Sequence, residues 1–148
     1  MCNEDRTVSI TYNGEVYNFA ELRRDLEMKG HRFASETDSE VIVHLYEQEG
    51  PDCVKRLNGI FAFGICDLRS GRPTLFVARD HFGVKPFYYV QQGRRFAFGS
   101  EIKALLQVPG VEAEIDARAL HQYLTFLWVP DPKTMQCLQT LPPFLTRF

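Results

Sequence analysis

The feature that most restricts the fold of this chain is a nearly continuous apolar run at residues 60–66 (IFAFGIC). A strand with one face in water alternates apolar and polar side chains, so an unbroken apolar run indicates a strand that is covered on both faces. Further strands are predicted at residues 7–12 and 74–79, and a hairpin is predicted at residues 87–99. The apolar run is therefore expected to form the centre of a sheet.

Helical patterns occur before and after these strands. Asn18 with Glu21 predicts a capping box and a helix that Gly30 ends, and a similar start at residues 37–40 predicts a second helix that ends at Gly50. Weaker signals predict three more helices, one closed by Asn58-Gly59, one near residues 100–105, and one that Asp116 caps and that Pro130 and Pro132 end. Helices and strands that follow each other without regular alternation favour an α+β fold.

Composition excludes several classes of function. The chain has 148 residues, 45% of them hydrophobic, with 17 basic and 19 acidic residues and a net charge of -2. We therefore expect one domain at residues 1–143 with a divergent tail at 144–148, no nucleic-acid partner and no membrane partner. No apolar run approaches the roughly 18 to 20 residues of a spanning helix, and no secretory signal opens the chain, so a cytoplasmic location is expected.

The four cysteines predict neither a metal site nor a disulfide framework, because they stand far apart and without histidine at ligand spacing. Two of them, Cys53 and Cys66, are expected to be buried as small apolar residues. The others are Cys2 and Cys137.

The stretch at residues 12–18 (YNGEVYN) brings polar groups together where the first strand is predicted to stop. Asn13 can donate from its side-chain amide, Gly14 allows a close backbone N–H donor, and Glu15 can accept from an ammonium group. Asn-Gly is also a common turn signal, and Asp38 can equally cap the second helix. These residues therefore indicate either a polar-substrate site or ordinary local structure.

A second candidate is the stretch at residues 79–83 (RDHFG). His81 beside Asp80 is typical of an oriented base, but the same residues are also typical of a salt-bridged turn.

Five blocks of this sequence, in this order, resemble the glutamine amidotransferase domain of glutamine-dependent asparagine synthetases. Together they are more specific than any single motif, and the resemblance runs from about residue 3 to residue 143. The blocks are residues 12–18 (YNGEVYN), 37–40 (TDSE), 57–63 (LNGIFAF), 78–89 (ARDHFGVKPFYY) and 99–105 (GSEIKAL).

The resemblance implies a function, a fold and roles for residues. The implied fold is the N-terminal-nucleophile αββα four-layer sandwich of mostly antiparallel sheets, and the implied reaction is hydrolysis of glutamine to glutamate and ammonia. Asn13 and Gly14 would form the oxyanion hole, and Glu15 and Asp38 would bind the α-amino group of glutamine. The ammonia would pass to a separate synthetase domain that uses ATP and magnesium, so no cofactor is expected in this chain itself.

In this family the nucleophile is an N-terminal cysteine, which makes Cys2 the candidate. However, the family continues with Gly-Ile and an apolar strand, whereas residues 3–6 (NEDR) follow here. An extended chain would place Cys2 up to about 36 Å from Asn13, at roughly 3.3 Å per residue, and no Gly or Pro stands between them to turn the chain.

We therefore expect an inactive fragment that begins at an internal methionine, with an incomplete sandwich. Its exposed sheet edge would favour association with a second copy. Two alternatives stay open. The chain is a non-catalytic glutamine-binding or interaction module, or it is a shortened enzyme in which Cys2 is the mature nucleophile.

Overall fold

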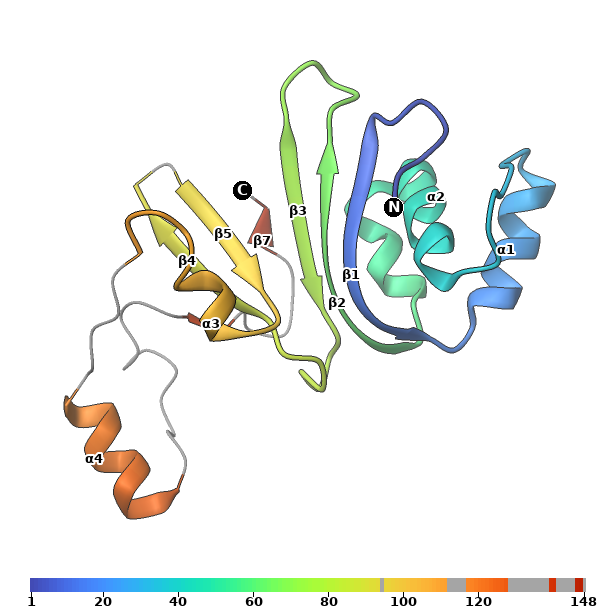
Figure 1. Cartoon of the computed structure of the whole chain (residues 1–148). Helices are drawn as coiled ribbons and strands as arrows, with labels where there is room; N and C mark the ends of the chain where they lie inside the picture. The colour runs from blue at the N-terminus through green and yellow to red at the C-terminus, as the bar shows by residue number, and fades with distance from the viewer. Residues whose placement is uncertain (94, 112–116, 128–138, 141–145, 148) are drawn as a thin grey trace. The chain divides into compact units, whose positions relative to one another are not determined.

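The structure, a computed structural model, describes residues 1–93, 95–111, 117–127, 139–140 and 146–147 (Figure 1). The chain divides into two compact units, one made of Met1–Lys85 with Pro142–Phe148 and the other of Pro86–Leu141. Each unit holds its own antiparallel sheet. The prediction of an α+β chain with antiparallel sheets is confirmed.

The sheet of the first unit has β2 at its centre, as the apolar run predicts. Its order is β1-β2-β3-β7, and each neighbouring pair is antiparallel. Residues 61–65 of β2 are buried without interruption, so both faces of this strand are covered. The strands are β1 (Val8–Val16), β2 (Gly59–Asp67), β3 (Thr74–Arg79) and β7 (Thr146–Arg147).

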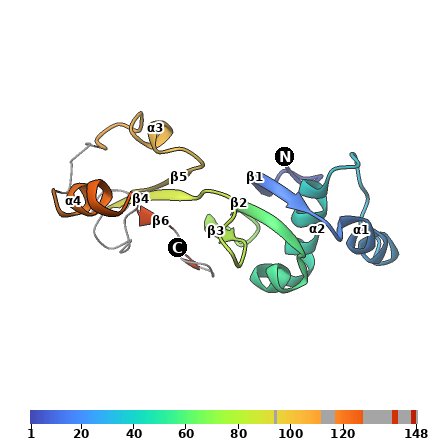
Figure 2. The ribbon, with the colours of Figure 1, turned by 90° about the horizontal axis from the view of Figure 1, so that it is seen from below.

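Helices cover one side of this sheet. α2 (Asp38–Glu49) packs on β1, α1 (Phe19–Met28) packs on α2, and the 3-10 helix η1 (Gly50–Arg56) follows α2 directly (Figure 2). The apolar stripes of the helices meet the inward residues of the strands in a single core. That core includes Val8, Val16, Leu22, Leu26, Val41, Leu45, Phe63, Ile65 and Phe76.

The cysteine predictions hold in part. Cys53 is fully buried, and burial raises the pKa of its thiol to about 12. Cys66, in contrast, is only half-buried near the end of β2. Cys137 lies outside the described residues.

The predicted capping box at the start of α1 is wrong. The side chain of Asn18 makes no capping bond to the helix. Its Nδ2 donates to the carbonyl of Arg56 at 2.9 Å, and its Oδ1 accepts from the backbone N–H of Asn58 at 3.0 Å. Asn18 therefore ties the start of α1 to the loop before β2, a partner that local spacing cannot reveal.

The N-terminal segment folds back on β1, so the extended course expected for it is wrong. Cys2 pairs with Ser9 in an antiparallel bridge, and Asn3 N donates to Val8 O at 3.0 Å. Arg6 adopts a left-handed φ of 59°, and the carboxylate of Asp5 accepts from the backbone N–H of Thr7 at 2.9 Å. Short polar side chains thus turn the chain where Gly and Pro are missing.

The second unit is built on the predicted hairpin. β4 (Tyr88–Gln92) pairs with β5 (Arg95–Gly99), and β6 (Gln139–Thr140) adds to the other edge of β4. Rings stack in pairs on the hairpin, Phe87 on Phe98 at 5.2 Å and Tyr89 on Phe96 at 5.5 Å between centroids. Cross-strand aromatic pairs of this kind fix the register of a hairpin.

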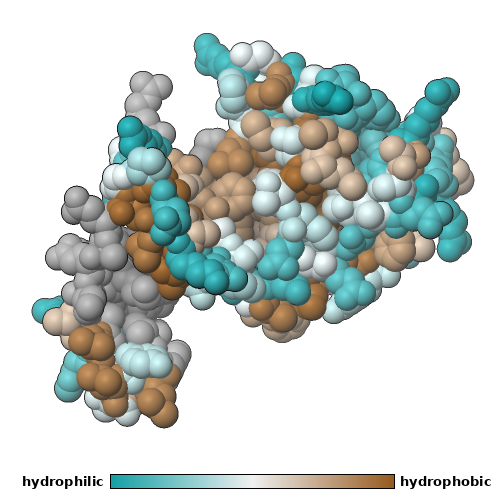
Figure 3. Space-filling view, viewed as in Figure 1, coloured by the Kyte–Doolittle hydropathy of each residue, from teal (hydrophilic) through white to brown (hydrophobic). Residues whose placement is uncertain are grey.

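Two helices complete the second unit, α3 (Ile102–Leu105) and α4 (Ala117–Phe126). Apolar side chains of α4 are exposed on the surface, among them Leu120 and Leu124 (Figure 3). The predicted cap Asp116 and the prolines at 130 and 132 lie outside the described residues. Within the described ranges, no helix is both long enough and apolar enough to cross a membrane.

Candidate functional site

Asn13, Gly14 and Glu15 lie inside β1, so the predicted turn at Asn13-Gly14 is wrong. They pair with Ala62, Phe61 and Ile60 of β2. Gly14 is needed because the two strands approach each other closely here. A Cβ at this position would lie 2.7 Å from the Cα of Phe61 and would also collide with the carbonyl oxygen of Ile60. The glycine therefore serves strand packing rather than a turn.

The backbone N–H of Gly14 points away from β2. Backbone hydrogen bonds of an antiparallel strand alternate between its two edges. On β1, Tyr17 N donates toward β2, to Asn58 O at 2.7 Å, whereas Ile10 N donates outward, to Met1 O at 2.9 Å. Gly14 lies four residues after Ile10, an even number, so its N–H also faces the outer edge of β1. That edge is where a backbone donor can reach a ligand.

Asp38, the first residue of α2, binds to the same outer edge. Its Oδ2 accepts from the Tyr12 hydroxyl at 2.5 Å and from the backbone N–H of Val16 at 2.9 Å. Burial, followed by this hydrogen bond and the negative charge of Asp38, raises the pKa of the Tyr12 phenol. Neither bond uses Oδ1, the second carboxylate oxygen of Asp38. The structure therefore brings Asp38 beside the stretch that holds Asn13, Gly14 and Glu15.

Glu40 fixes the loop that precedes α2 and so helps to position Asp38. Its carboxylate accepts from the backbone N–H groups of Ala34 and Ser35, both at 2.7 Å. Burial opposes ionisation of this carboxyl, but these bonds and the bond from the Ser35 hydroxyl lower the pKa of Glu40. Sequence reasoning assigned Glu40 to a helix start but missed its partners, as it missed Tyr12 as an anchor of Asp38.

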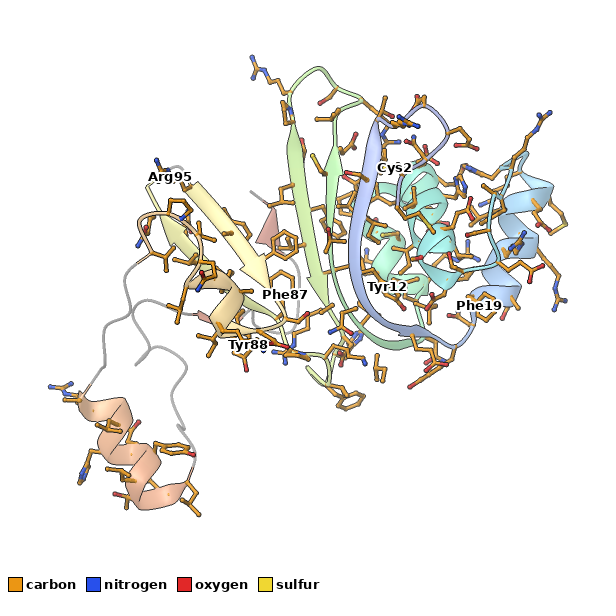
Figure 4. The ribbon with its side chains drawn as sticks, in the orientation of Figure 1. Cys2, Tyr12, Phe19, Phe87, Tyr88 and Arg95 are labelled. Carbon is orange, nitrogen blue, oxygen red and sulfur yellow. The ribbon has the colours of Figure 1, made fainter. Side chains whose placement is uncertain are left out.

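Cys2 does not reach this stretch. It is exposed and lies opposite Ser9 (Figure 4 shows Cys2 near one end of β1 and Tyr12 farther along it). Asn13 is four residues beyond Ser9, which corresponds to about 13 Å along the strand. The amino group of Met1 donates to the carbonyl of Ile10 at 3.2 Å. The fold-back shortens the separation that an extended chain predicts, but the thiol is still remote from Asn13.

Asp80 holds the backbone of the turn that contains His81. It is 2% exposed, and its two oxygens accept four backbone N–H groups at 3.0 to 3.3 Å. Burial alone would raise its pKa, but these bonds outweigh burial and lower the pKa of Asp80. Arg79 donates to the carbonyls of Gly83 and Lys85 rather than to Asp80. Backbone bonds therefore hold the turn, and the predicted salt bridge is wrong.

The chemistry of the β1 edge follows from its groups. The edge offers an outward backbone N–H and, one residue away, a side-chain amide that can donate. It also carries two carboxylates, one exposed at Glu15 and one held by β1 at Asp38. N–H donors stabilise a carbonyl oxygen that becomes an oxyanion, and carboxylates bind an ammonium group. The arrangement suits a substrate that carries both an amide or ester carbonyl and an amine.

Comparison with known proteins agrees with this chemistry. Residues 1–144 match the family model described as a glutamine amidotransferase domain. Asparagine synthetase [glutamine-hydrolyzing] 3 of Bacillus subtilis is 48% identical over 116 residues, which are 78% of this chain and 19% of that protein. A putative asparagine synthetase of Methanocaldococcus jannaschii is 40% identical over 127 residues, 84% of this chain and 24% of that protein. The chain thus spans about a fifth to a quarter of the curated relatives it matches.

Solved structures share the fold. Glutamine phosphoribosylpyrophosphate amidotransferase from B. subtilis has a TM-score of 0.58 and 24% identity, over 71% of this chain and 24% of that one. A structure titled as the allosteric regulatory enzyme of purine biosynthesis has a TM-score of 0.60 and 18% identity, over 95% of this chain and 28% of that one. At this identity the likeness concerns the fold alone.

Proposed function

The chain belongs to the family of glutamine amidotransferase domains, and on that premise we propose that it is the glutaminase part of an asparagine synthetase. In the parent enzyme this part hydrolyses glutamine to glutamate and ammonia. A separate synthetase domain then uses the ammonia in the ATP-dependent amidation of aspartate, and ATP and magnesium bind there. The similarity to glutamine-hydrolysing asparagine synthetases over most of this chain supports the assignment.

One observation carries the proposal: Asp38 is bonded to β1 beside Glu15, on the edge toward which the N–H of Gly14 points. The ammonium group of glutamine binds between the carboxylates of Glu15 and Asp38. This contact orients the substrate so that its side-chain carbonyl lies against Asn13 and Gly14. Hydrogen bonds to a charged group are worth about 1.5–3 kcal/mol each, so the two carboxylates together contribute about 3–6 kcal/mol, which corresponds to recognition in the range from millimolar to tens of micromolar.

The reaction requires a cysteine thiolate beside the substrate carbonyl that Asn13 and Gly14 hold. Attack of the sulfur on the amide carbon forms a C–S bond and moves an electron pair onto the oxygen, which Asn13 Nδ2 and Gly14 N–H stabilise. The C–N bond then breaks, and the nitrogen leaves as ammonia after it gains a proton. Water hydrolyses the remaining thioester and releases glutamate.

For the chain as it stands, we propose glutamine binding without turnover. The position of Cys2 opposite Ser9, about 13 Å along the strand from Asn13, supports this reading. A cytoplasmic location remains part of the proposal, as does association through a sheet edge. Residues 1–3 already occupy the outer edge of β1 beside Val8 and Ile10, so the available edge is shorter than the sequence suggests.

Two assays on the purified chain test these statements: calorimetric titration with glutamine, and ammonia release in the presence of glutamine. We expect binding that Glu15→Gln and Asp38→Asn each weaken about tenfold to a hundredfold, with no ammonia release. The matched control is Glu36→Gln, because Glu36 is an exposed acidic residue in the loop before α2.

Two other results would change the assignment. Ammonia release that Cys2→Ala and Asn13→Ala both abolish, together with loss of Met1 by mass spectrometry, would establish Cys2 as a working nucleophile and overturn the reading without turnover. If glutamine neither binds nor reacts, the proposal is wrong for this chain.

A further inference from the structure

Outside the β1 edge, three potential metal ligands meet in the first unit. We call His31, His44 and Glu47 the His31 cluster. His31 follows α1, and the other two residues lie three positions apart on one face of α2. One ligand atom of each residue lies within 4.8 Å of the ligand atoms of the other two.

The approaches within the cluster converge on one carboxylate oxygen. Oε2 of Glu47 is 2.8 Å from Nδ1 of His44 and 3.9 Å from Nδ1 of His31. Two imidazoles and one carboxylate, with a water as fourth ligand, make a set that Zn²⁺ binds in tetrahedral geometry. Ligand atoms about 2.0–2.2 Å from a tetrahedral zinc lie roughly 3.3–3.6 Å from one another, so Glu47 and His44 need to move slightly apart and His31 needs to move slightly closer.

Each ligand also has a polar neighbour on its outer side, where metal ligands in proteins usually have a partner. Asn3 Nδ2 donates to Oε1 of Glu47 at 2.6 Å. Nε2 of His31 faces Oε1 of Gln48 at 3.4 Å. On the far side of the His44 ring, Nε2 lies 3.8 Å from Oε1 of Glu40. These contacts would hold the ligands in place around an ion.

The state of His44 is the observation that points to a ligand. Its side chain is 1% exposed, and among the described residues Nε2 is buried without a hydrogen-bond partner. When neutral His44 donates from Nδ1 to Glu47, its Nε2 lone pair faces the carboxylate of Glu40, which is unfavourable. A metal on Nδ1 moves the proton to Nε2, which then points an N–H at Glu40. Metal binding thus replaces an unfavourable contact between the Nε2 lone pair and Glu40 by a favourable one.

We propose that the His31 cluster binds a Zn²⁺ ion and that this ion ties the segment after α1 to α2. Through Asn3 it also reaches the N-terminal turn, so three segments of the first unit are linked at one point. Phe33 packs edge-on against the His44 ring at 4.7 Å and gives the site an apolar wall. Sequence reasoning searched for ligands near cysteines and therefore missed His44-x-x-Glu47. This proposal is independent of glutamine binding.

The test uses the full chain carrying Cys2→Ala, which removes an exposed thiol that could bind zinc. We would titrate it with ZnCl₂ in competition with a chromophoric chelator and follow thermal denaturation at each concentration. We expect one Zn²⁺ per chain and a rise in Tm with zinc, because an ion that binds only the folded chain stabilises it. Co²⁺ in its place should give the visible absorption of a tetrahedral site.

Variants locate the binding. His31→Gln and Glu47→Gln should each abolish the stoichiometric binding and the zinc-dependent rise in Tm. His121→Gln, which changes an exposed histidine of α4 in the other unit, should leave both unchanged. Glu47→Gln also loses native hydrogen bonds, so His31→Gln, checked by circular dichroism, is the decisive variant. If the parent chain shows no stoichiometric zinc binding, or if His31→Gln binds zinc as the parent does, the proposal is wrong.

Discussion

Asp38 and Asp80 are two aspartates of the first unit that each accept backbone N–H groups, yet the structure uses them differently. Both oxygens of Asp80 are engaged, by four N–H groups of its own turn and of β2. Within the described part of the chain, Asp38 engages only Oδ2, which binds Tyr12 and Val16. A carboxylate whose acceptor capacity is used within the chain is structural, whereas one that keeps an unused oxygen beside other polar groups can bind a ligand. Substitutions at both sites test this difference.

The largest effect is expected for Asp80→Asn. The substitution turns one acceptor oxygen into an NH₂ group that faces backbone donors, so two backbone N–H groups lose their partner. We expect a loss of about 3 kcal/mol or more in the free energy of unfolding, measured with urea. Asp52→Asn, at an exposed ion pair with Lys55, is the control and should change stability by less than about 0.5 kcal/mol.

Asp80→Asn also tests how the stability of the chain depends on pH. The folded-state pKa of Asp80 lies below its unfolded value, so its contribution is present above the unfolded pKa and is lost as pH falls through the folded pKa. The parent chain should therefore lose stability below about pH 4, and Asp80→Asn should flatten part of that acid limb. Acid limbs of equal slope in the two proteins would contradict this account.

The next effect concerns the packing of β1 on β2. Gly14→Ala places a Cβ 2.7 Å from the Cα of Phe61, on backbone that cannot yield easily. We expect a loss of about 1–3 kcal/mol in urea unfolding. Gly99→Ala is the matched control, since the nearest atom to its Cβ is 3.8 Å away and its φ is not positive. Equal stability of the two variants would show that β1 does not approach β2 as described.

Asp38→Asn should separate binding from stability. The remaining side-chain oxygen can still accept from Tyr12 and Val16, while the NH₂ group takes the place of the unused oxygen and the charge is lost, so glutamine affinity should fall about tenfold to a hundredfold. We expect the free energy of unfolding to fall by only about 1 kcal/mol, less than for Asp80→Asn. A stability loss as large as that of Asp80→Asn would remove the distinction between the two aspartates.

The smallest effect is expected for Tyr12→Phe. The folded-state pKa of Tyr12 is raised, so its contribution is complete below the unfolded pKa, near 10, and is lost as pH rises above that value. The parent chain should lose stability at alkaline pH, and Tyr12→Phe should lose less. At neutral pH the variant should be less stable by about 1 kcal/mol, because Asp38 loses a partner. Thermal denaturation from pH 7 to pH 11 measures both effects.

Elements with strong local signals could be read from the sequence. The apolar run at residues 60–66 predicted the central strand, and β3 has the predicted bounds of Thr74–Arg79. The residue types and their order also identified Asn13, Gly14, Glu15 and Asp38 as candidates; the first three lie in β1, and Asp38 bonds to the outer edge of that strand. The end of β1 was predicted too early, at residue 12 instead of Val16. An Asn-Gly pair is a turn signal only when no neighbouring strand pairs with it. Here residues 13 and 14 pair with β2.

The sequence by itself determined the central strand β2, the strand β3 and the helices α1 and α2, because burial periodicity and breaker residues act over a few neighbours. It also determined the types of groups available at residues 13–15 and 38. Only the tertiary structure decided that, among the described groups, Asp38 keeps an unused oxygen and Gly14 an outward N–H. It likewise decided that both oxygens of Asp80 are fully used by backbone donors. It also decided that Cys2 pairs with Ser9, and that His31 meets His44 and Glu47. Those outcomes depend on hydrogen bonds between segments far apart in the chain, which no local pattern specifies.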